Sequence, residues 1–254
     1  MHSYYLRDTR PRRLATALTD AGWDVDVVCA RDDGEQAAQT VNGVRIYRLP
    51  ARRRRGGKMR YLFEYVSFTL LAFAEVTALW LRRRQRAVYV VGIPNFLVFA
   101  ALIPRLGGAR VLLDMRDPLP EFFEAKYKLN ESDALVRGLL TEERISARFA
   151  SQVVTVHHTM ATLYERSVPA AKIGVVMNAP DPRVFAVDSH ARRDPDGRTM
   201  LYAGTVASRY GVDLAVRALA VLRDEIPALR IRIVGDGDLI PMLRAIAREE
   251  DLED

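Results

Sequence analysis

A glycine-flanked loop near the carboxyl end of the chain has residue types that suit binding of a phosphate. In YAGTVASRYGVDLAVRAL, residues 202–219, a strand is expected to end at Gly204 and a helix to open at Gly211. The first-turn N–H groups and the dipole of such a helix attract anions, and Arg209, just before it, could pair with a phosphate through its guanidinium fork. An ordinary strand-to-helix turn with a solvated arginine has the same spacing, and spacing alone favours that interpretation.

A second glycine turn follows in the same region. Gly235 and Gly237 form a G-x-G between an apolar strand and a helix in LRIRIVGDGDLIPML, residues 229–243. A dinucleotide-binding fingerprint needs a third glycine that this turn lacks, so a structural turn is the commoner explanation. An oxidoreductase with a nucleotide cofactor is therefore disfavoured.

Candidate catalytic side chains follow two apolar strands in the first half of the chain. Arg116 and Asp117 come after the strand in LLDMRDPLPE, where Arg116 could face a phosphate or form a surface salt bridge with Asp117. His157 and His158 end the strand in VVTVHHTM, and the carboxyl ends of parallel strands form the ligand edge of a sheet. A metal site would need a third ligand beside these histidines, and the sequence offers none, so we expect no metal and at most one histidine in the site.

The positive charge of the chain is concentrated in one segment. The formal net charge is +6, but residues 52–86 alone carry ten basic and two acidic side chains, and the remainder has a net charge of −2. The basic residues form two tight clusters around an apolar stretch, whereas a nucleic-acid groove spreads them among aromatic or base-reading elements. We therefore expect an anionic membrane surface as partner and no nucleic acid. The expected membrane contacts are Arg52, Arg53, Arg54, Arg55, Lys58 and Arg60.

The apolar stretch between the clusters, residues 61–81, is long enough to span a bilayer. Glu64 and Glu75 fall on one narrow face of the corresponding helix, and each carboxylate near mid-span would cost about 2.5 to 3.5 kcal/mol. We therefore expect an amphipathic helix that lies in the membrane interface. A mostly buried helix with solvated basic ends fits the pattern equally well, and both can hold if one face meets the membrane.

Alternating strands and helices must position these groups. Most expected strands are continuous apolar runs, which is typical of a parallel sheet covered on both faces. The expected strands are 24–30, 41–50 with an Asn-Gly turn, 87–92, 109–115, 151–156, 172–178, 199–204 and 229–235, and the expected helices are 9–21, 96–108, 131–150, one ending at Glu165, 211–225 and 239–250. Residues 179–198, with three prolines, predict a linker between two α/β units.

Length and composition exclude several other classes of protein. The 254 residues are 49% hydrophobic and 28% charged, which is ordinary globular composition and excludes disordered and collagen-like chains. The single cysteine, Cys29, cannot form an internal disulfide, so a reducing cytosolic setting is favoured. The first residues, MHSYYLRDTRPRR, lack the apolar region of a signal peptide.

The order of these pieces resembles a known family. The strand, the glycine loop, RYGVDLAVRAL and IPALRIRIVGDGD are similar to the first half of the nucleotide-sugar domain of GT-B glycosyltransferases, specifically the retaining family-4 group that builds cell-envelope polysaccharides and glycolipids. RDTRPRRLATALTDAGWDVDVVC resembles the first helix and second strand of that family, and KIGVVMNAPDPRVF has a counterpart in the same order. The resemblance covers nearly the entire chain.

The resemblance implies an α/β, GT-B-like fold with two Rossmann-like domains and parallel sheets. Residues 1–180 would form the acceptor-side domain, 181–198 a linker, and 199–254 part of the nucleotide-sugar-binding domain. The implied activity moves a sugar from a nucleoside-diphosphate-sugar donor to an envelope polysaccharide or a lipid-linked acceptor, with no metal or other cofactor. The implied location is the cytoplasmic face of the inner membrane, to which the protein would bind peripherally.

The resemblance also assigns roles to individual residues. The common loop of the family has an arginine directly after the first glycine and a lysine before the second, where this chain has Thr205 and Tyr210. Arg209 is then the expected ligand of the donor diphosphate, assisted by Gly204, Thr205 and Gly211, and would neutralise charge that develops on the leaving group. Relatives often have a histidine at the place of Arg116, which with Asp117 remains the catalytic candidate.

Parts of the family pattern are missing near both ends. The family has two glutamates eight positions apart after the VGDG turn, and no glutamate pair of this chain has that spacing. The family's first strand and its glycine loop are also missing before residue 1. We therefore expect the carboxyl-terminal domain to be incomplete and the chain to be truncated at both ends. The alternative function is that of a catalytically inactive relative that binds a membrane surface.

Overall fold

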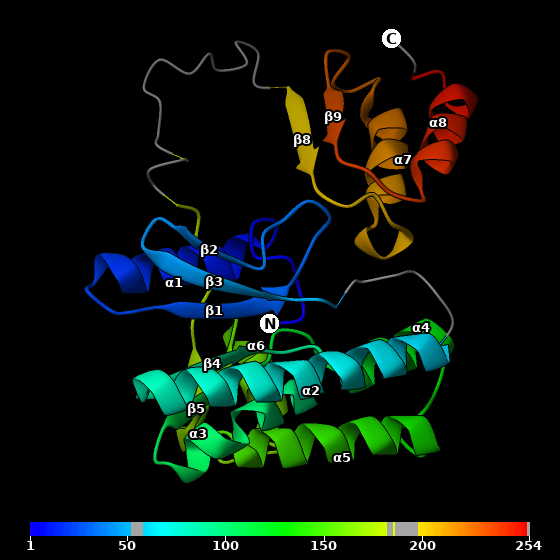
Figure 1. Cartoon of the computed structure of the whole chain (residues 1–254). Helices are drawn as coiled ribbons and strands as arrows, with labels where there is room; N and C mark the ends of the chain where they lie inside the picture. Colours follow the sequence, from blue (N-terminus) through cyan, green and yellow to red (C-terminus); the bar gives the residue numbers. More distant parts are fainter. Residues whose placement is uncertain (52–57, 182–184, 186–197, 253–254) are drawn as a thin grey trace. The chain divides into compact units, whose positions relative to one another are not determined.

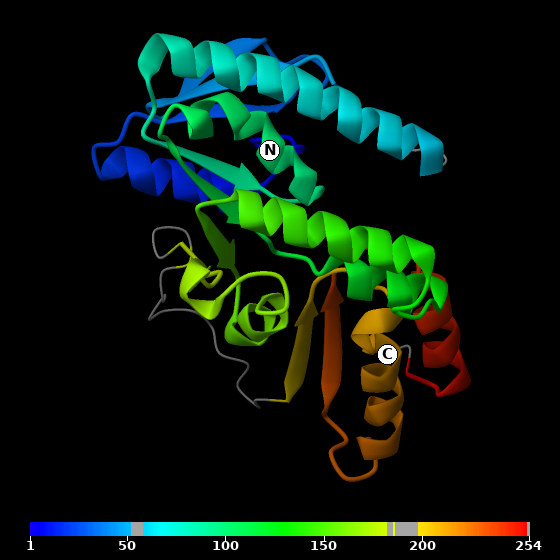
Figure 2. The same ribbon diagram turned by 90° about the horizontal axis from the view of Figure 1, so that it is seen from below.

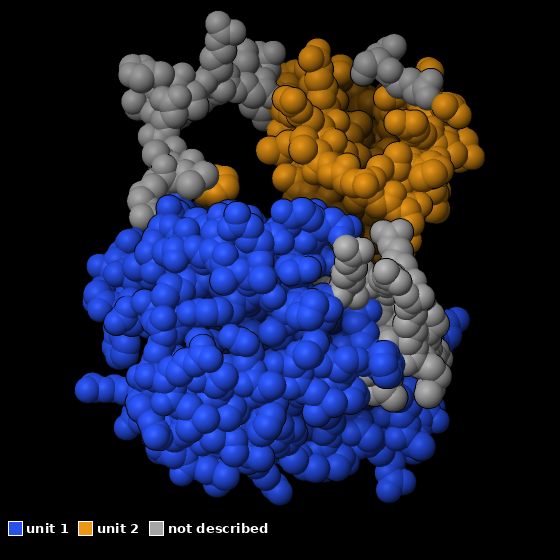
Figure 3. Space-filling view, viewed as in Figure 1, with its two compact units in different colours: residues 1–184 blue, residues 185–254 orange. Residues whose placement is uncertain are grey.

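The computed structural model describes residues 1–51, 58–181, 185 and 198–252, which form helices and strands in alternation (Figure 1). The chain divides into two compact units, unit 1 from Met1 to Val184 and unit 2 from Phe185 to Asp254 (Figure 3). Most of the predicted linker, residues 181–198, lies outside the described residues.

Unit 1 contains two sheets with helices between their strands. Its strands are β1 (Asp26–Ala30), β2 (Ala38–Val41), β3 (Val44–Leu49), β4 (Ala87–Val91), β5 (Arg110–Asp114), β6 (Gln152–Thr155) and β7 (Ile173–Val175). Its α-helices are α1 (Thr9–Asp20), α2 (Lys58–Arg83), α3 (Leu102–Leu106), α4 (Leu119–Tyr127), α5 (Ala134–Phe149) and α6 (His158–Tyr164), and its 3-10 helices are η1 (Asn95–Ala101) and η2 (Ala170–Lys172).

The larger sheet of unit 1 has the strand order β4-β5-β6-β7, and all of its strands are parallel. The smaller sheet has the order β1-β3-β2, in which β1 and β3 are parallel and β2 is antiparallel to β3. The predicted Asn-Gly turn joins β2 to β3, and Asn42 and Gly43 both have the positive φ that this hairpin turn requires.

The core of unit 1 lies between the larger sheet and the helices that cover it. Phe68 of α2, Leu97 of η1, Leu113 of β5 and Tyr164 of α6 belong to one buried cluster. η1 packs against α2, α5, β4 and β5, and α6 packs against β6 and β7. α2 runs along the outside of the unit (Figures 1 and 2). Apolar strands buried among helices in this way explain why the sequence shows continuous hydrophobic runs.

Unit 2 is a smaller α/β unit. Its elements are β8 (Thr199–Ala203), η3 (Ser208–Tyr210), α7 (Val212–Leu222), β9 (Arg230–Val234) and α8 (Ile240–Glu249). β8 and β9 are parallel, and Tyr202 and Ile233 pack against the buried residues of α7 and α8. Leu201 and Val234 on the strands are exposed.

The predicted α/β fold with parallel strands is confirmed, with three differences in detail. β2 is an antiparallel strand, because the two-residue turn reverses the chain. The predicted helix 96–108 begins as the 3-10 helix η1, whose residues are mostly buried among α2, α5 and the sheet, and that packing outweighs its poorer hydrogen-bond geometry. The helix α4 was not predicted, although Pro120 in its first turn is a common helix-start signal.

Candidate functional site

The loops after β4, β5, β6 and β7 gather at one edge of the larger sheet, because the strands are parallel and end on the same side. The loop after β4 approaches β5 closely at Gly92, whose N–H donates to the Asp114 carbonyl at 2.9 Å. A Cβ at Gly92 would lie 2.8 Å from the same oxygen, so only glycine fits there. The loop after β4 therefore packs closely against the end of β5, next to the residues that follow β5.

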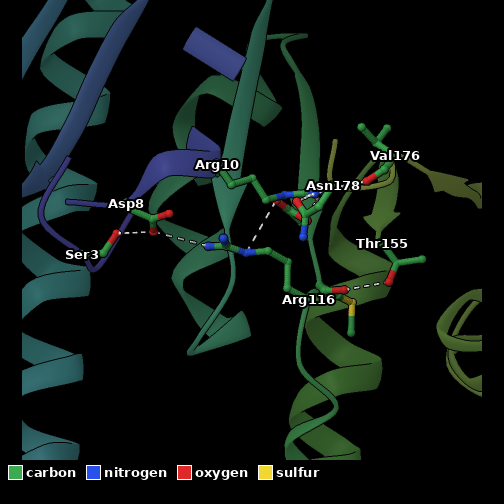
Figure 4. A network of polar contacts seen from close by, with 9 residues as sticks. Ser3, Asp8, Arg10, Arg116, Thr155, Val176 and Asn178 are labelled. Atoms are coloured by element: carbon green, nitrogen blue, oxygen red, sulfur yellow. Dashed lines mark hydrogen bonds and ion pairs between the residues drawn. The ribbon is translucent and has the colours of Figure 1, made fainter. Parts of the chain in front are cut away.

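A network of polar contacts that includes Arg10 and Arg116 organises this edge (Figure 4). The side chain of Asp114, at the end of β5, is 1% exposed, and it accepts a hydrogen bond from Arg10 Nε at 3.2 Å. Arg116 Nε lies 3.8 Å from the same carboxylate. The pKa of the Tyr89 hydroxyl is raised by burial and by the nearby Asp114. Two guanidinium groups thus compensate one buried negative charge, as a buried carboxylate requires.

Arg116, the predicted catalytic candidate, lies in this network. Its Nη2 atom lies 3.7 Å from the Asp8 carboxylate, which also accepts a hydrogen bond from Ser3 at 3.0 Å. The Arg116 side chain remains 22% exposed. Asp117 is exposed, and the alternative surface pair between Arg116 and Asp117 is not seen among the described ion pairs of Arg116, which are with Asp8 and Asp114.

The sequence did not predict the part that α1 plays here. Arg10, in the first turn of α1, donates to Asn178 Oδ1 at 2.5 Å and to the Val176 carbonyl at 3.2 Å, and Arg13 donates to the Ala179 carbonyl. A signal was available, because a helix N-terminus disfavours cations and the first turn of α1 has basic residues and no acidic ones. Arginines at such a position indicate a partner outside the helix that binds their positive charge, and for Arg10 this partner is Asp114.

The two histidines after β6 have different roles. His157 is the N-cap of α6, and its Nδ1 accepts a hydrogen bond from the Met160 N–H at 3.3 Å. His158 is the first residue of α6 and is exposed. Within the described ranges, no group of three or more His, Cys, Asp or Glu side chains could hold a metal ion.

An ion-pair cluster holds the helices that follow Asp117. Glu143 of α5 is fully buried and accepts two hydrogen bonds from Arg166, at 3.1 and 3.0 Å, and one from Ser167 at 2.5 Å. Arg166 also pairs with Glu121 of α4. Because α4 begins two positions after Asp117, this cluster fixes the direction of the loop that carries the catalytic candidates.

In unit 2, the four residues predicted to bind a diphosphate lie in one loop between β8 and α7. Gly211, with φ of 65°, is the N-cap of α7. The Gly204 N–H already donates to the Val234 carbonyl at 3.0 Å, so it is not available to a ligand, whereas the Thr205 N–H has no backbone acceptor among the described residues. Arg209 is exposed and lies over the ring of Tyr210, 4.9 Å from its centroid.

The glycines of the predicted G-x-G turn have a packing role. The Val206 N–H donates to the Asp236 carbonyl at 2.9 Å, which brings the loop after β8 against the loop after β9. A Cβ at Gly235 would lie 1.8 Å from the Gly204 carbonyl oxygen, and one at Gly237 would lie 2.0 Å from that of Val206. Only glycine permits this approach, so the turn supports the Arg209 loop by holding its backbone.

The basic and apolar segment forms α2. Of the predicted membrane contacts, Arg52, Arg53, Arg54 and Arg55 lie outside the described residues, and Lys58 and Arg60 belong to the first turn of α2 without a described side-chain position. The part from Phe63 to Arg83 is long and apolar enough to cross a membrane by length and composition. Only 22% of its apolar 18-residue stretch is buried inside the protein. The large apolar side chains that α2 exposes are Phe63, Val66, Leu70, Leu71 and Leu81, which we call the α2 stripe.

Both units are α/β units with parallel strands. Arginines at the ends of parallel strands and a glycine loop at a helix N-terminus are typical of proteins that bind phosphorylated ligands. Residues 8–179 match the family described as the glycosyl transferase 4-like domain. The chain belongs to this family, as its resemblance to GT-B glycosyltransferases indicated. No curated protein matches the chain.

Solved structures with some similarity to the chain have low sequence identity. A Staphylococcus aureus TarM mutant in complex with fondaparinux, alpha-GlcNAc-glycerol and UDP is 8% identical, with a TM-score of 0.47 over 73% of this chain and 35% of that protein. S. aureus MnaA with UDP is 14% identical, with a TM-score of 0.41 over 74% of this chain and 51% of that protein. A trehalose-6-phosphate synthase, studied with bisubstrate glycomimetics, is 12% identical, with a TM-score of 0.49 over 96% and 66%. The chain spans about one third to two thirds of the length of these proteins.

Proposed function

We propose that this chain transfers a sugar from a nucleoside-diphosphate-sugar to an envelope polysaccharide or a lipid-linked acceptor, at the cytoplasmic face of the inner membrane. The observation that carries the proposal is the match of residues 8–179 to the glycosyl transferase 4-like domain. Geometry in both units supports it.

The donor would bind through the loop between β8 and α7. Arg209 has no carboxylate partner among the described residues, and the Thr205 N–H and the first turn of α7 offer backbone donors beside it. A guanidinium and free N–H groups at a helix N-terminus are the groups that stabilise charge on a leaving diphosphate. No metal is needed in this arrangement, since the arginine supplies the positive charge.

The acceptor would bind at the carboxyl edge of the larger sheet in unit 1. Arg116 is held by Asp8 and Asp114 and keeps part of its surface accessible, so its orientation is fixed before a ligand arrives. An arginine fixed in this way can pair with a phosphate of the acceptor or the donor at little entropic cost. The exposed carboxylate of Asp117 is adjacent to it and is the candidate group to orient the acceptor hydroxyl.

The membrane would be met by α2. The α2 stripe presents apolar side chains to the outside of unit 1, and basic residues stand at both ends of the helix. Such a helix lies in the interface of an anionic membrane, where each basic residue contributes about 1 kcal/mol. Binding to anionic vesicles at low salt tests this part, and it fails if replacing Arg52, Arg53, Arg54 and Arg55 by glutamine leaves binding unchanged.

A transfer assay tests the activity. The 254-residue protein is incubated with membranes and a panel of nucleoside-diphosphate-sugars, and sugar incorporated into lipid or polysaccharide is measured, with and without EDTA. We expect one donor to be used, no effect of EDTA, and a loss of about a hundredfold in Arg209→Ala. The control is Arg217→Ala, an arginine of α7 that pairs with Glu250 on the surface and should leave transfer unchanged.

A second candidate function is that of a catalytically inactive membrane-surface binding protein. It is favoured by the α2 stripe, which needs no donor site. Absence of transfer from every donor, together with retained vesicle binding, would support this alternative and overturn the proposed activity.

A further inference from the structure

A basic hollow of about 380 Å³ lies at the amino edge of the larger sheet, at the opposite ends of the strands from the candidate active site. Its lining includes Trp80, Arg84, Arg86, Gly107 and Arg110. Arg86 directly precedes β4 and Arg110 opens β5, and the Arg110 N–H donates to the Arg86 carbonyl at 2.9 Å. In the sheet register Arg110 pairs with Ala87, so the backbones of Arg86 and Arg110 are neighbours at this edge.

The end of α2 builds the floor of the hollow. The Arg84 N–H donates to the Trp80 carbonyl at 2.8 Å, and Arg84 then takes a positive φ of 51°, which turns the chain away from the helix axis. The Arg84 guanidinium lies 4.3 Å from the centroid of the Trp80 ring. The indole is pressed against Gly107, where a Cβ would lie 2.1 Å from the ring, so a side chain at that position would displace Trp80. The floor is thus formed by tightly packed residues.

No described carboxylate compensates the charge of the hollow. Among the described residues, Arg84, Arg86 and Arg110 form no ion pair with a carboxylate, whereas the neighbouring Arg83 lies 3.7 Å from Asp26. Cations at a helix carboxyl end are favoured by the helix dipole, which accounts for Arg84 but not for Arg86 and Arg110, since neither belongs to α2. Three arginines that line one hollow suit a phosphate, whose oxygens accept the paired N–H donors of a guanidinium.

Two exposed leucines are adjacent in sequence to residues that line the hollow. Leu81, at the end of the α2 stripe, is 56% exposed, and Leu106, directly before Gly107, is 76% exposed. Arginines together with exposed leucines match a lipid, in which a phosphate adjoins an apolar chain. A free phosphate would gain nothing from these leucines.

We propose that this hollow binds the phosphate group of an anionic membrane lipid while Leu81 and Leu106 enter the apolar layer. The inference rests on the membrane contact of the proposed function and adds a defined lipid site to it. The sugar-transfer activity does not depend on it, because the hollow and the candidate active site are at opposite edges of the sheet.

The test compares two double variants with equal loss of charge. Arg86→Gln/Arg110→Gln removes two arginines of the hollow, and Arg137→Gln/Arg144→Gln removes two exposed arginines of α5 that have no described carboxylate partner. Cosedimentation is measured with vesicles of phosphatidylglycerol and phosphatidylcholine, and circular dichroism checks the fold. We expect at least about a tenfold loss of affinity for the first variant and less than about twofold for the second.

Equal losses in both variants would mean that only net charge matters and would overturn the lipid site, as would no loss in either. Failure of the unaltered protein to bind these vesicles would overturn both the lipid site and the proposed membrane contact, but not the transfer activity.

A second experiment titrates inorganic phosphate into the Trp23→Phe variant, in which Trp80 is the remaining tryptophan. Saturation of its fluorescence change at low millimolar phosphate would identify a free-anion site and overturn the lipid assignment, whereas no change supports it.

Discussion

Replacing Arg10 by methionine should strongly destabilise unit 1 because it leaves Asp114 without its main partner. The Asp114 side chain is 1% exposed and the Arg10 side chain 13%, and their ion pair spans 3.2 Å. Breaking a buried pair from one side costs about 3 to 5 kcal/mol. Arg116, which lies 3.8 Å from the carboxylate, is retained in the variant, so we expect a loss at the lower end, about 3 kcal/mol.

Tryptophan fluorescence measures this loss selectively, since both tryptophans, Trp23 and Trp80, lie in unit 1. For a unit of this size, about 3 kcal/mol corresponds to a fall in Tm of about 6 to 12 °C. The matched control is Arg7→Met, because Arg7 pairs with Asp32 but is 73% exposed, and a surface pair contributes about 0 to 1 kcal/mol.

A double-mutant cycle isolates the pair itself. Once Asp114→Asn has removed the buried charge, Arg10→Met should cost about 1 to 3 kcal/mol less than in the unaltered protein. The reasoning is refuted if Arg10→Met lowers Tm no more than Arg7→Met does, or if the two changes at Arg10 and Asp114 are additive.

Three other predictions follow from burial and close contact. Gly237→Ala should destabilise unit 2 by about 1 to 3 kcal/mol, because the new Cβ would lie 2.0 Å from a carbonyl oxygen. Its control is Gly138→Ala in α5, where no atom lies within 4 Å of the new Cβ and unit 1 should gain up to about 1 kcal/mol. Thermal melts measure both changes, and equal effects would contradict the packing role of Gly237. Burial raises the pKa of the Cys29 thiol, so its reaction with Ellman's reagent should be slow and should follow unfolding in urea, and rapid reaction of the folded protein would be contrary evidence. Burial also raises the pKa of Glu142 above its ordinary value of 4.5, so folded unit 1 keeps this proton to higher pH than the unfolded chain does. Its contribution to stability should therefore fall as the pH rises from about 4.5 through the raised pKa, and urea midpoints should show that Glu142→Gln removes this part of the pH dependence.

The sequence predicted the local features of the molecule well. The loop from Gly204 to Gly211 precedes a helix N-terminus as expected, and the apolar runs correspond to parallel strands. Both features depend on residues close together in the chain, through backbone conformation and side-chain periodicity.

The network around Asp114 could not be predicted in the same way. Arg10 meets Asp114, Val176 and Asn178 across separations of 104, 166 and 168 positions, and no periodicity relates groups so far apart. The roles of Gly235 and Gly237 also depend on the neighbouring loop, which only the folded unit brings within contact. Sequence reasoning identified the elements and not their mutual contacts.

The orientation of α2 is a further case. Helical periodicity placed Glu64 and Glu75 on one face but could not tell which face points outward. In the structure Glu64 is 11% exposed and lies 3.4 Å from the buried His2, while Phe63 is 75% exposed. The amphipathic pattern predicts that Glu64 faces water, but in the structure it contacts His2 of the amino-terminal segment.

The α2 stripe has a practical consequence for handling the protein. Phe63, Leu70 and Leu81 are each more than half exposed, and exposed apolar side chains of neighbouring molecules attract one another in water. Purified protein should self-associate as its concentration rises and become monodisperse in mild detergent, whose tails cover the same side chains. One surface of one helix thus contributes directly to the solubility of the protein during purification.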